Sequence, residues 1–258
     1  MAKQNTRLEK LITRLKENQV LTVKQLAQDL NVSEMTVRRD IALLEQENKV
    51  KSFYGGISLA PAYEQPLAQS YTIDSELIER KEQKRRIAMK AASMVEYNDV
   101  ILIDTGSTTG CMLDYFPEDS FNTVYCYALN ILNGACRKNS LNIVACGGFY
   151  HSNTGMFESG EGASLILKTQ INKAFMAARG VSDVVGITTA EPYEVNMKKA
   201  ALSVSKQKIL LVDSSKFGKS WYAKYADLNE IDIIITDTDI REEHKQMILD
   251  KGITLYIV

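Results

Sequence analysis

The N-terminal part of the chain carries apolar side chains at helical spacing in three successive segments. This pattern predicts an amphipathic helix over residues 5–18, then two short helices that face each other across a tight turn at Asn31-Val32-Ser33. Ser33 is a favourable N-cap for the later helix, because its hydroxyl can accept a hydrogen bond from a free backbone N–H. The apolar positions of the three helices are Leu8, Leu11, Ile12 and Leu15, then Leu26, Ala27 and Leu30, then Val37, Ile41 and Leu44.

The next segment, VKSFYGGIS at residues 50–58, has the pattern of a β-hairpin with a bend at Gly55-Gly56. Three helices and such a hairpin make a winged helix-turn-helix, whose third helix fits the major groove of DNA. Arginines on that helix can bind guanine edges or phosphates. The alternative is an ordinary helical hairpin with a solvated charged face. The polar face comprises Met35, Thr36, Arg38, Arg39 and Asp40, and the hairpin adds Lys49, Lys51 and Tyr54 as candidates for backbone or minor-groove contact.

Residues 59–77 contain Pro61 and Pro66 without periodicity, and we expect a linker there. The chain is thus divided into a DNA-binding domain at 1–58, a linker at 59–77 and a second domain at 78–258. A helix is predicted from about Ile78, with apolar positions facing the core. Its basic run, Arg80 to Arg86, is either a solvated helix face or a further contact with DNA.

From residue 99 onward, short apolar segments alternate with helical patterns. Strands buried on both faces are continuously apolar, so this alternation predicts a mainly parallel, doubly wound α/β sheet. We expect helices within residues 105–116, 129–139, 149–169, 194–205 and 241–252, the third of them preceded by a loop. The predicted strands are VILID, TVYCYA, LNIVACGG, residues 173–178, KILLVD, IDIIITD and ITLYIV.

Composition narrows the class of protein. With 258 residues, 45% hydrophobic and 24% charged, the chain is typical of a globular protein of two domains. The four cysteines have no CxxC spacing and there are only two histidines, so we expect reduced thiols and no metal site. The sequence has neither a signal-peptide pattern nor an apolar run of membrane-spanning length, which predicts a cytoplasmic protein without membrane contact.

Charge is distributed unevenly along the chain. Residues 1–58 contain ten Lys and Arg against seven Asp and Glu, a net charge of +3, whereas the whole chain has a net charge of -1. A mildly basic head on an acidic body is typical of a small DNA-binding module joined to another domain. Because a charge of +3 is modest, we expect the protein to bind DNA as a homo-oligomer, a dimer or larger.

Polar residues follow several of the predicted strands, and ligands of open α/β sheets bind beyond the carboxyl ends of the strands. The segment Asp104-Thr105-Gly106-Ser107-Thr108-Thr109 lies between a strand and a helix N-terminus, where backbone N–H groups and hydroxyls can cradle a phosphate. It is not a Walker A loop, because no GxxxxGK[ST] pattern is present. The alternative interpretation is a simple helix cap.

Further candidates lie at the ends of the other strands or on the helix at 194–205. Lys216 can pair with a phosphate and Asp213 can accept hydrogen bonds from sugar hydroxyls. Glu194 and Lys198 either point into the same cleft or form an ordinary surface pair. Together with Asn130, Gly147, Gly148 and Gly180, they indicate a small phosphorylated polyol or sugar, and turn chemistry alone is the alternative.

The head has the sequence TVKQLAQDLNVSEMTVRRDIALLEQENKVKSFYGG, and the body contains, in this order, EQKRRIAMKAA, IDTGSTT, YALN, CGGFYHSNTGMF and VDSSKFGK. Over essentially the whole chain, these motifs resemble the winged helix-turn-helix and, in the same order, the sensor domain of the DeoR family of bacterial repressors. The resemblance implies a sensor fold related to ribose-5-phosphate isomerase and coenzyme A transferases, and a phosphorylated sugar as effector. YALN and CGGFYHSNTGMF are most similar to members that control deoxyribonucleoside catabolism, which implies deoxyribose 5-phosphate.

Two segments depart from the family pattern. ARGVSDVVGITTAEPYEVNMKKAA replaces a longer polar stretch, and Tyr54 stands where many members have His. Carried over by position, base contact falls on Ser33, Met35, Thr36, Arg38 and Arg39. The effector site falls on Asp104, Gly106, Ser107, Thr108, Thr109, Asn130, Gly147, Gly148, Gly180, Glu194, Lys198, Asp213 and Lys216.

The resulting prediction is a repressor of a sugar or nucleoside catabolic operon that a phosphorylated sugar releases from operator DNA, with no cofactor and no catalytic residue. Two alternatives stay open. One is an activator. The other is a sugar-phosphate isomerase or hydrolase with a DNA-binding appendage, in which Asp104, Glu194 and Lys216 would serve as base, acid and electrophile.

Overall fold

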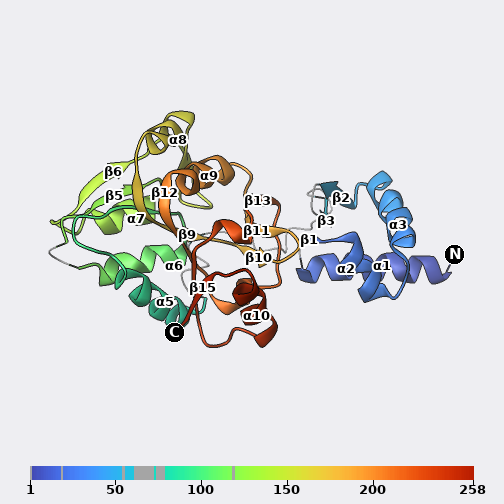
Figure 1. Ribbon diagram of the computed structural model, residues 1–258. Helices are drawn as coiled ribbons and strands as arrows, with labels where there is room; N and C mark the ends of the chain where they lie inside the picture. The colour runs from blue at the N-terminus through green and yellow to red at the C-terminus, as the bar shows by residue number, and fades with distance from the viewer. Residues whose placement is uncertain (1, 19, 54–55, 61–72, 74–78, 118–119) are drawn as a thin grey trace. The chain divides into compact units, whose positions relative to one another are not determined.

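The chain consists of two compact units in the computed structural model, whose elements are labelled in Figure 1. The structure describes residues 2–18, 20–53, 56–60, 73, 79–117 and 120–258. One unit comprises residues 1–70 together with 219–222, and the other comprises 71–218 and 223–258. The boundary between the two units at residues 70 and 71 lies within the segment that the sequence predicts to be a linker.

The N-terminal unit is a winged helix-turn-helix, as predicted. Its elements are α1 (Ala2–Asn18), β1 (Val20–Leu21), α2 (Val23–Leu30), α3 (Glu34–Gln46), β2 (Val50–Phe53) and β3 (Gly56–Leu59). The wing β2–β3 is antiparallel and ends at Leu59, one residue into the predicted linker. β1 pairs with β3 and completes a three-stranded sheet. A strand of two residues has no periodicity, so β1 was not predictable from the apolar pattern.

Local capping fixes the two helices of the helix-turn-helix. Thr22 and Gln25 form a capping box at the start of α2, and Asn31 ends that helix in the left-handed conformation. The Ser33 side chain accepts a hydrogen bond from the Thr36 backbone N–H, which confirms Ser33 as the N-cap of α3. The apolar stripes of α1, α2 and α3 meet the wing in a core of their own, formed by Leu11, Leu15, Leu21, Leu26, Ala27, Val37, Ile41, Leu44, Val50, Ile57 and Leu59.

A seven-stranded parallel sheet forms the centre of the second unit, in the order β15-β14-β12-β9-β4-β5-β6. From β4 the chain proceeds outward through β5 and β6, then returns to place β9 beside β4 and proceeds the other way. The strand order therefore reverses between β4 and β9, the position where open α/β sheets bind ligands. The strands are β4 (Val100–Ile103), β5 (Thr123–Cys126), β6 (Asn142–Ala145), β9 (Ile171–Ala177), β12 (Ser205–Leu211), β14 (Ile233–Thr236) and β15 (Thr254–Ile257).

Helices cover both faces of this sheet, which confirms the predicted doubly wound architecture. Along β4, Leu102 belongs to one hydrophobic core, whereas Ile101 and Ile103 belong to the other. Figure 1 shows α8 and α9 on one side and α5 and α6 on the other. The helices are α5 (Lys81–Ala92), α6 (Ser107–Gly110) with the 3-10 turn η1 (Cys111–Tyr115), α7 (Leu129–Ala135), α8 (Gly160–Leu167), α9 (Glu194–Val204) and α10 (Glu242–Asp250).

Several short elements were not predicted. A hairpin of β7 (Phe149–His151) and β8 (Met156–Glu158) replaces the expected loop before α8. β10 (Gly180–Ser182), β11 (Gly186–Thr189) and β13 (Ala223–Ala226) form a small antiparallel sheet. Two further 3-10 turns are η2 (Ser214–Lys216) and η3 (Leu228–Glu230).

The helix predicted from about Ile78 begins at Lys81, after Arg80 in the left-handed conformation, and Ile78 lies outside the described residues. Lys84, in the basic run of this helix, is buried instead of solvated. Within the part of the chain that the structure describes, no helix has both the length and the apolar character needed to cross a membrane.

Candidate ligand pocket and DNA-reading helix

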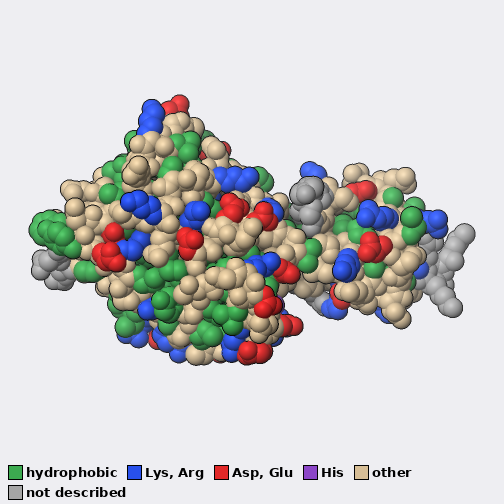
Figure 2. Space-filling view, viewed as in Figure 1, with side chains coloured by type: hydrophobic (Ala, Val, Ile, Leu, Met, Phe, Trp, Pro, Cys, Tyr) green, Lys and Arg blue, Asp and Glu red, His purple; other side chains and the backbone are tan. Residues whose placement is uncertain are grey.

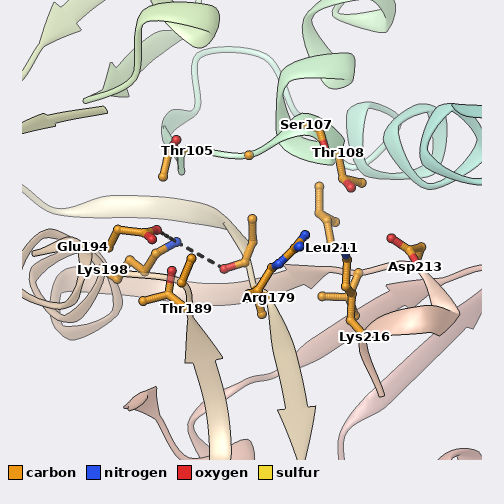
Figure 3. Close-up of a pocket in the computed structure, with 15 residues that line it drawn as sticks. Thr105, Ser107, Thr108, Arg179, Thr189, Glu194, Lys198, Leu211, Asp213 and Lys216 are labelled. Carbon is orange, nitrogen blue, oxygen red and sulfur yellow. Dashed lines mark hydrogen bonds and ion pairs between the residues drawn. The ribbon is translucent and has the colours of Figure 1, made fainter. Parts of the chain in front are cut away.

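A pocket of about 450 Å³, including the space at its open mouth, lies at the carboxyl ends of β4, β9 and β12. Its walls come from the loop after β4, the ends of β9, β11 and β12, the first turn of α9, and η2 (Figure 3). The lining residues are Thr105, Gly106, Ser107, Thr108, Ala177, Ala178, Arg179, Thr189, Ala190, Glu194, Lys198, Leu211, Val212, Asp213 and Lys216.

Beneath the pocket, Asp104 holds Lys198 in place. Asp104 is fully buried, and its Oδ2 accepts hydrogen bonds from Lys198 Nζ at 2.5 Å and from the Ala177 backbone N–H at 2.8 Å. Its Oδ1 accepts a hydrogen bond from the Tyr127 hydroxyl at 2.6 Å. Lys198 Nζ also lies 3.4 Å from Glu194 Oε2, and a dashed line in Figure 3 marks this contact. One buried ammonium group is thus shared by two carboxylates.

The burial of these groups shifts their pKa values. For Lys198, burial by itself lowers the pKa, but the charges of Asp104 and Glu194 and their hydrogen bonds outweigh it, so the pKa lies above its usual value. Lys198 is therefore a permanent cation facing the pocket. Burial, reinforced by the charge of Asp104, raises the pKa of Tyr127 and Tyr225 well above 10. Both tyrosines accordingly stay neutral near pH 7.

The loop after β4 owes its shape to close packing. A Cβ at Gly106 would lie 2.8 Å from the Ala177 Cβ and 2.9 Å from Thr109 Oγ1, so only glycine fits. Thr109 Oγ1 donates to the backbone carbonyls of Asp104 and Gly106, at 2.8 and 3.1 Å. Asn130 Nδ2 donates to the same Gly106 carbonyl at 3.0 Å. These bonds fix the loop, so the Ser107 and Thr108 side chains are presented to the pocket.

The structure brings seven of the thirteen predicted effector residues into the pocket wall: Gly106, Ser107, Thr108, Glu194, Lys198, Asp213 and Lys216. Asp104, Thr109 and Asn130 support the wall from below without lining it. The remaining three predicted effector residues, Gly147, Gly148 and Gly180, lie outside the pocket wall. Gly147 and Gly148 follow β6 at the edge of the sheet, two strands away from β4 and three from β9, and Gly180 is buried at the start of β10.

Sequence reasoning missed the other pocket-lining residues. Arg179 is the second residue after β9, so the rule that ligands bind at strand ends would have found it. Thr189 ends β11, a strand that the sequence did not predict, so no signal pointed to it. Thr105 lies within the predicted loop but was not singled out.

The proposed catalytic roles do not suit this geometry. Asp104 was the candidate base, but its carboxylate does not line the pocket and its two oxygens accept three hydrogen bonds. Glu194, the candidate acid, is 3% exposed and its Oε1 accepts a hydrogen bond from the Glu191 backbone N–H at 3.1 Å. Both carboxylates therefore serve to hold the pocket together.

On the DNA-binding unit, α3 presents an exposed polar face. Arg38 and Arg39 are exposed, and Met35 is 61% exposed. Ser33 and Thr36 sit at the start of the helix, where the two hydroxyl oxygens are 2.9 Å apart. The structure brings these five side chains to one end and face of α3, as a recognition helix requires.

In the wing, Lys51 is exposed and Lys49 Nζ lies 2.6 Å from Glu47 Oε2. Tyr54 lies outside the described residues. Figure 2 shows Lys and Arg side chains interspersed with Asp and Glu on the face in view, so charge alone does not mark a DNA-binding surface on that face.

The prediction that Asp40 belongs to the exposed face of α3 is wrong. Asp40 is 1% exposed, and its two oxygens accept hydrogen bonds from Arg7 Nε at 2.5 Å and Arg7 Nη2 at 2.8 Å. A bidentate pair of this kind joins α1 to α3. Helical spacing could not reveal it, because the partner lies on another helix.

Comparison with known proteins agrees with this architecture. Residues 7–61 match the DeoR-like helix-turn-helix domain, and residues 79–238 match the DeoR C terminal sensor domain. The chain is 31% identical to the deoxyribose operon repressor of Escherichia coli strain K12 over 92% of both chains. It is 30% identical to the HTH-type transcriptional regulator IolR of Bacillus subtilis strain 168, also over 92% of both chains.

Similar solved structures are more distant. Ribose 5-phosphate isomerase A from Methanocaldococcus jannaschii has a TM-score of 0.41 and 16% identity, over 54% of this chain and 55% of that chain. The probable sor operon regulator from Shigella flexneri has a TM-score of 0.42 and 9% identity, over 66% of this chain and 89% of that chain. Both sequence domains match one family, in the predicted order. The chain therefore belongs to the DeoR family: it is a transcriptional regulator and not an enzyme, with a helix-turn-helix domain followed by a sensor domain.

Proposed function

We propose that this regulator represses a sugar or nucleoside catabolic operon and is released from its operator by a phosphorylated sugar that binds the pocket. The observation that carries the proposal is the chemistry of the pocket wall. Three cationic side chains, Arg179, Lys198 and Lys216, line it together with the hydroxyls of Ser107 and Thr108. Cations and hydroxyl donors suit a phosphate, while the carboxylate of Asp213 suits the hydroxyls of a sugar.

The lead candidate for the effector is deoxyribose 5-phosphate. Its support is the resemblance of YALN and CGGFYHSNTGMF to regulators of deoxyribonucleoside catabolism, together with the relative in Escherichia coli that is named the deoxyribose operon repressor. The Bacillus subtilis relative IolR is as similar in sequence, so other phosphorylated sugars belong in any screen.

The effector is tested by a thermal-shift screen of the full-length protein against phosphorylated sugars. A ligand at about a hundred times its dissociation constant should stabilise the folded protein by about 2.7 kcal/mol. Lys216→Ala should weaken this stabilisation, because a cation is removed from the pocket wall. Lys206→Ala, which removes an exposed lysine of β12, is the matched control. If no phosphorylated sugar stabilises the protein, or if both variants respond like wild type, the proposal fails.

For DNA, we propose that α3 reads the operator in the major groove, and that Lys51 and Tyr54 of the wing contact its backbone. Arg38→Ala and Arg39→Ala should each weaken operator binding by about 1–3 kcal/mol, because each removes a side chain able to bind a base edge or phosphate. Arg137→Ala, at an exposed position of the sensor unit, is the control. Fluorescence anisotropy with operator DNA measures the effect, and unchanged affinity in both α3 variants would contradict the assignment.

We further propose that the protein acts as a homo-oligomer, a dimer or larger, in the cytoplasm, where the operator lies. A dimer presents two recognition helices to two half-sites, which compensates for the modest charge of one head. Repression, as opposed to activation, is tested by operon reporter output in a strain that lacks the protein. Reporter output should rise in that strain, and a fall would mean activation.

A further inference from the structure

The turn between β7 and β8 contacts both the pocket and the segment that joins the two domains. Ile73 is the one described residue between Ala60 and Glu79. Its backbone N–H donates to the Asn153 carbonyl at 2.9 Å, and its side chain is 7% exposed. Gly155, in the left-handed conformation, packs against it, since a Cβ at Gly155 would lie 3.6 Å from Ile73 Cγ2. The turn therefore anchors the linker at Ile73.

The same turn is bonded directly to the pocket wall. Thr105, which lines the pocket, donates its hydroxyl to the Thr154 carbonyl at 3.1 Å. Both residues are at least 95% buried, with exposed fractions of 5% and 1%. A buried hydrogen bond of this kind is costly to break, because the carbonyl left behind has no water to bind. If Thr105 moves, this hydrogen bond therefore either resists the movement or moves the turn with it.

A second connection runs from α9 to the turn. Glu194, at the start of that helix, accepts a hydrogen bond from the Glu191 backbone N–H, and the Glu191 carboxylate accepts one from Asn153 Nδ2 at 3.1 Å. Tyr193 strengthens this second connection, since its hydroxyl donates a hydrogen bond to Asn153 Oδ1 at 2.8 Å. Two walls of the pocket are therefore bonded to the turn that holds Ile73, one at Thr154 and the other at Asn153.

We propose that the turn at residues 152–155 couples the pocket to the linker, so that a change at Thr105 or Glu194 alters the hold on Ile73. This inference rests on the proposed function for the ligand and extends it to the means of regulation. Releasing Ile73 lengthens the tether between the sensor unit and the DNA-binding unit. The effective concentration of one head at its half-site, with the other head already bound, depends on that tether length.

The test measures hydrogen exchange of the Ile73 amide in the full-length protein, without ligand. Thr105→Val keeps the shape of the side chain and removes its hydrogen bond to Thr154. It should lower the protection of Ile73 by about tenfold. Thr105→Ser retains a hydroxyl and should restore most of the protection. Thr188→Val, which removes a buried threonine hydrogen bond to the Gly180 backbone carbonyl outside the pocket wall, is the matched control and should have no effect at Ile73.

The core amide of Leu210 serves as internal reference, because this residue is fully buried in β12. Equal protection of Ile73 in wild type and Thr105→Val would overturn the proposal, and so would an equal loss at Ile73 and Leu210. In a second arm, deoxyribose 5-phosphate is added to wild type. Stabilisation of the protein without a change at Ile73 overturns the coupling and leaves the proposed function standing. If deoxyribose 5-phosphate does not stabilise the protein, that result counts against this effector only. The exchange rates of Ile73 in the Thr105 variants then still test the coupling.

Discussion

At the scale of single residues, Asp104 shows how burial decides what a carboxylate does. Its position after a strand and before a glycine-rich loop suggested direct contact with an effector. In the structure, its two oxygens bind Lys198, Tyr127 and the Ala177 backbone, and the side chain is fully buried. Removing one partner of such a buried pair is strongly destabilising, because the other charge is left uncompensated. Asp104 thus positions Lys198.

Alkaline pH should destabilise the sensor unit through its buried tyrosines. Burial raises the pKa of Tyr127 and Tyr225 in the folded protein, so their contribution to stability is complete below about pH 10, the pKa of unfolded tyrosine. It is lost as the pH rises further, by up to about 1.4 kcal/mol per pH unit for each tyrosine. Urea unfolding between pH 8 and pH 11 measures this loss.

Tyr127→Phe should lower stability at pH 8, because Asp104 loses a hydrogen bond, and should reduce the further loss above pH 10. Tyr97→Phe, at a residue that is 74% exposed, is the control. The buried thiols contribute in the same direction, since burial raises the pKa of Cys126 to about 12 and that of Cys146 to about 11. An identical pH profile for wild type and Tyr127→Phe would contradict this account.

At the scale of elements, Gly148, the second glycine after β6, allows the chain to pack closely against the β7–β8 hairpin. A Cβ at Gly148 would lie 2.2 Å from the Glu158 carbonyl oxygen of β8, and its φ of 157° favours glycine. Gly148→Ala should therefore lower the free energy of unfolding by about 2 kcal/mol, as steric strain of this kind typically does. Chemical denaturation measures the change.

Gly147→Ala is the matched control, because nothing lies within 4 Å of a Cβ at that position. It should leave both stability and effector binding unchanged. If Gly147→Ala instead weakens the stabilisation by a phosphorylated sugar, this glycine contacts the effector, as the family resemblance implies.

Predictability from sequence followed the apolar character of each element. Apolar segments such as those around Leu102 and Ile234 identified the strands of the parallel sheet, because strands buried on both faces are mostly apolar. β7 (FYH) and β11 (GITT) lack a continuous aliphatic run and are too short to show alternation, so neither signal was present. Thr189 and the partners of Ile73 depend on those elements, so they could not be predicted.

At the scale of the whole molecule, the modest charge of the head determines how DNA binding responds to salt. A dimer whose heads together neutralise six to ten phosphates should lose roughly a thousandfold or more in operator affinity between 50 and 200 mM salt. Lys51→Ala should lower the slope of log affinity against log salt by about one for each head. Anisotropy across salt concentrations measures the slope, and sedimentation measures the oligomer.

Arg137→Ala should leave the salt slope unchanged, since this exposed residue belongs to the sensor unit. A sedimenting monomer that binds the operator with full affinity would contradict the proposed oligomer.

The place of β9 in the sheet has a consequence for the synthesis of the protein. β9 lies between β4 and β12, so the pocket is complete only after the chain has been made as far as Lys216. The separate core of the DNA-binding unit lies between Leu11 and Leu59, so it is made first and can form while the sensor strands are still being synthesised. A chain that is terminated or cleaved before β12 keeps its recognition helix and lacks the pocket. Such a fragment would compete for operators and could not be released by the metabolite.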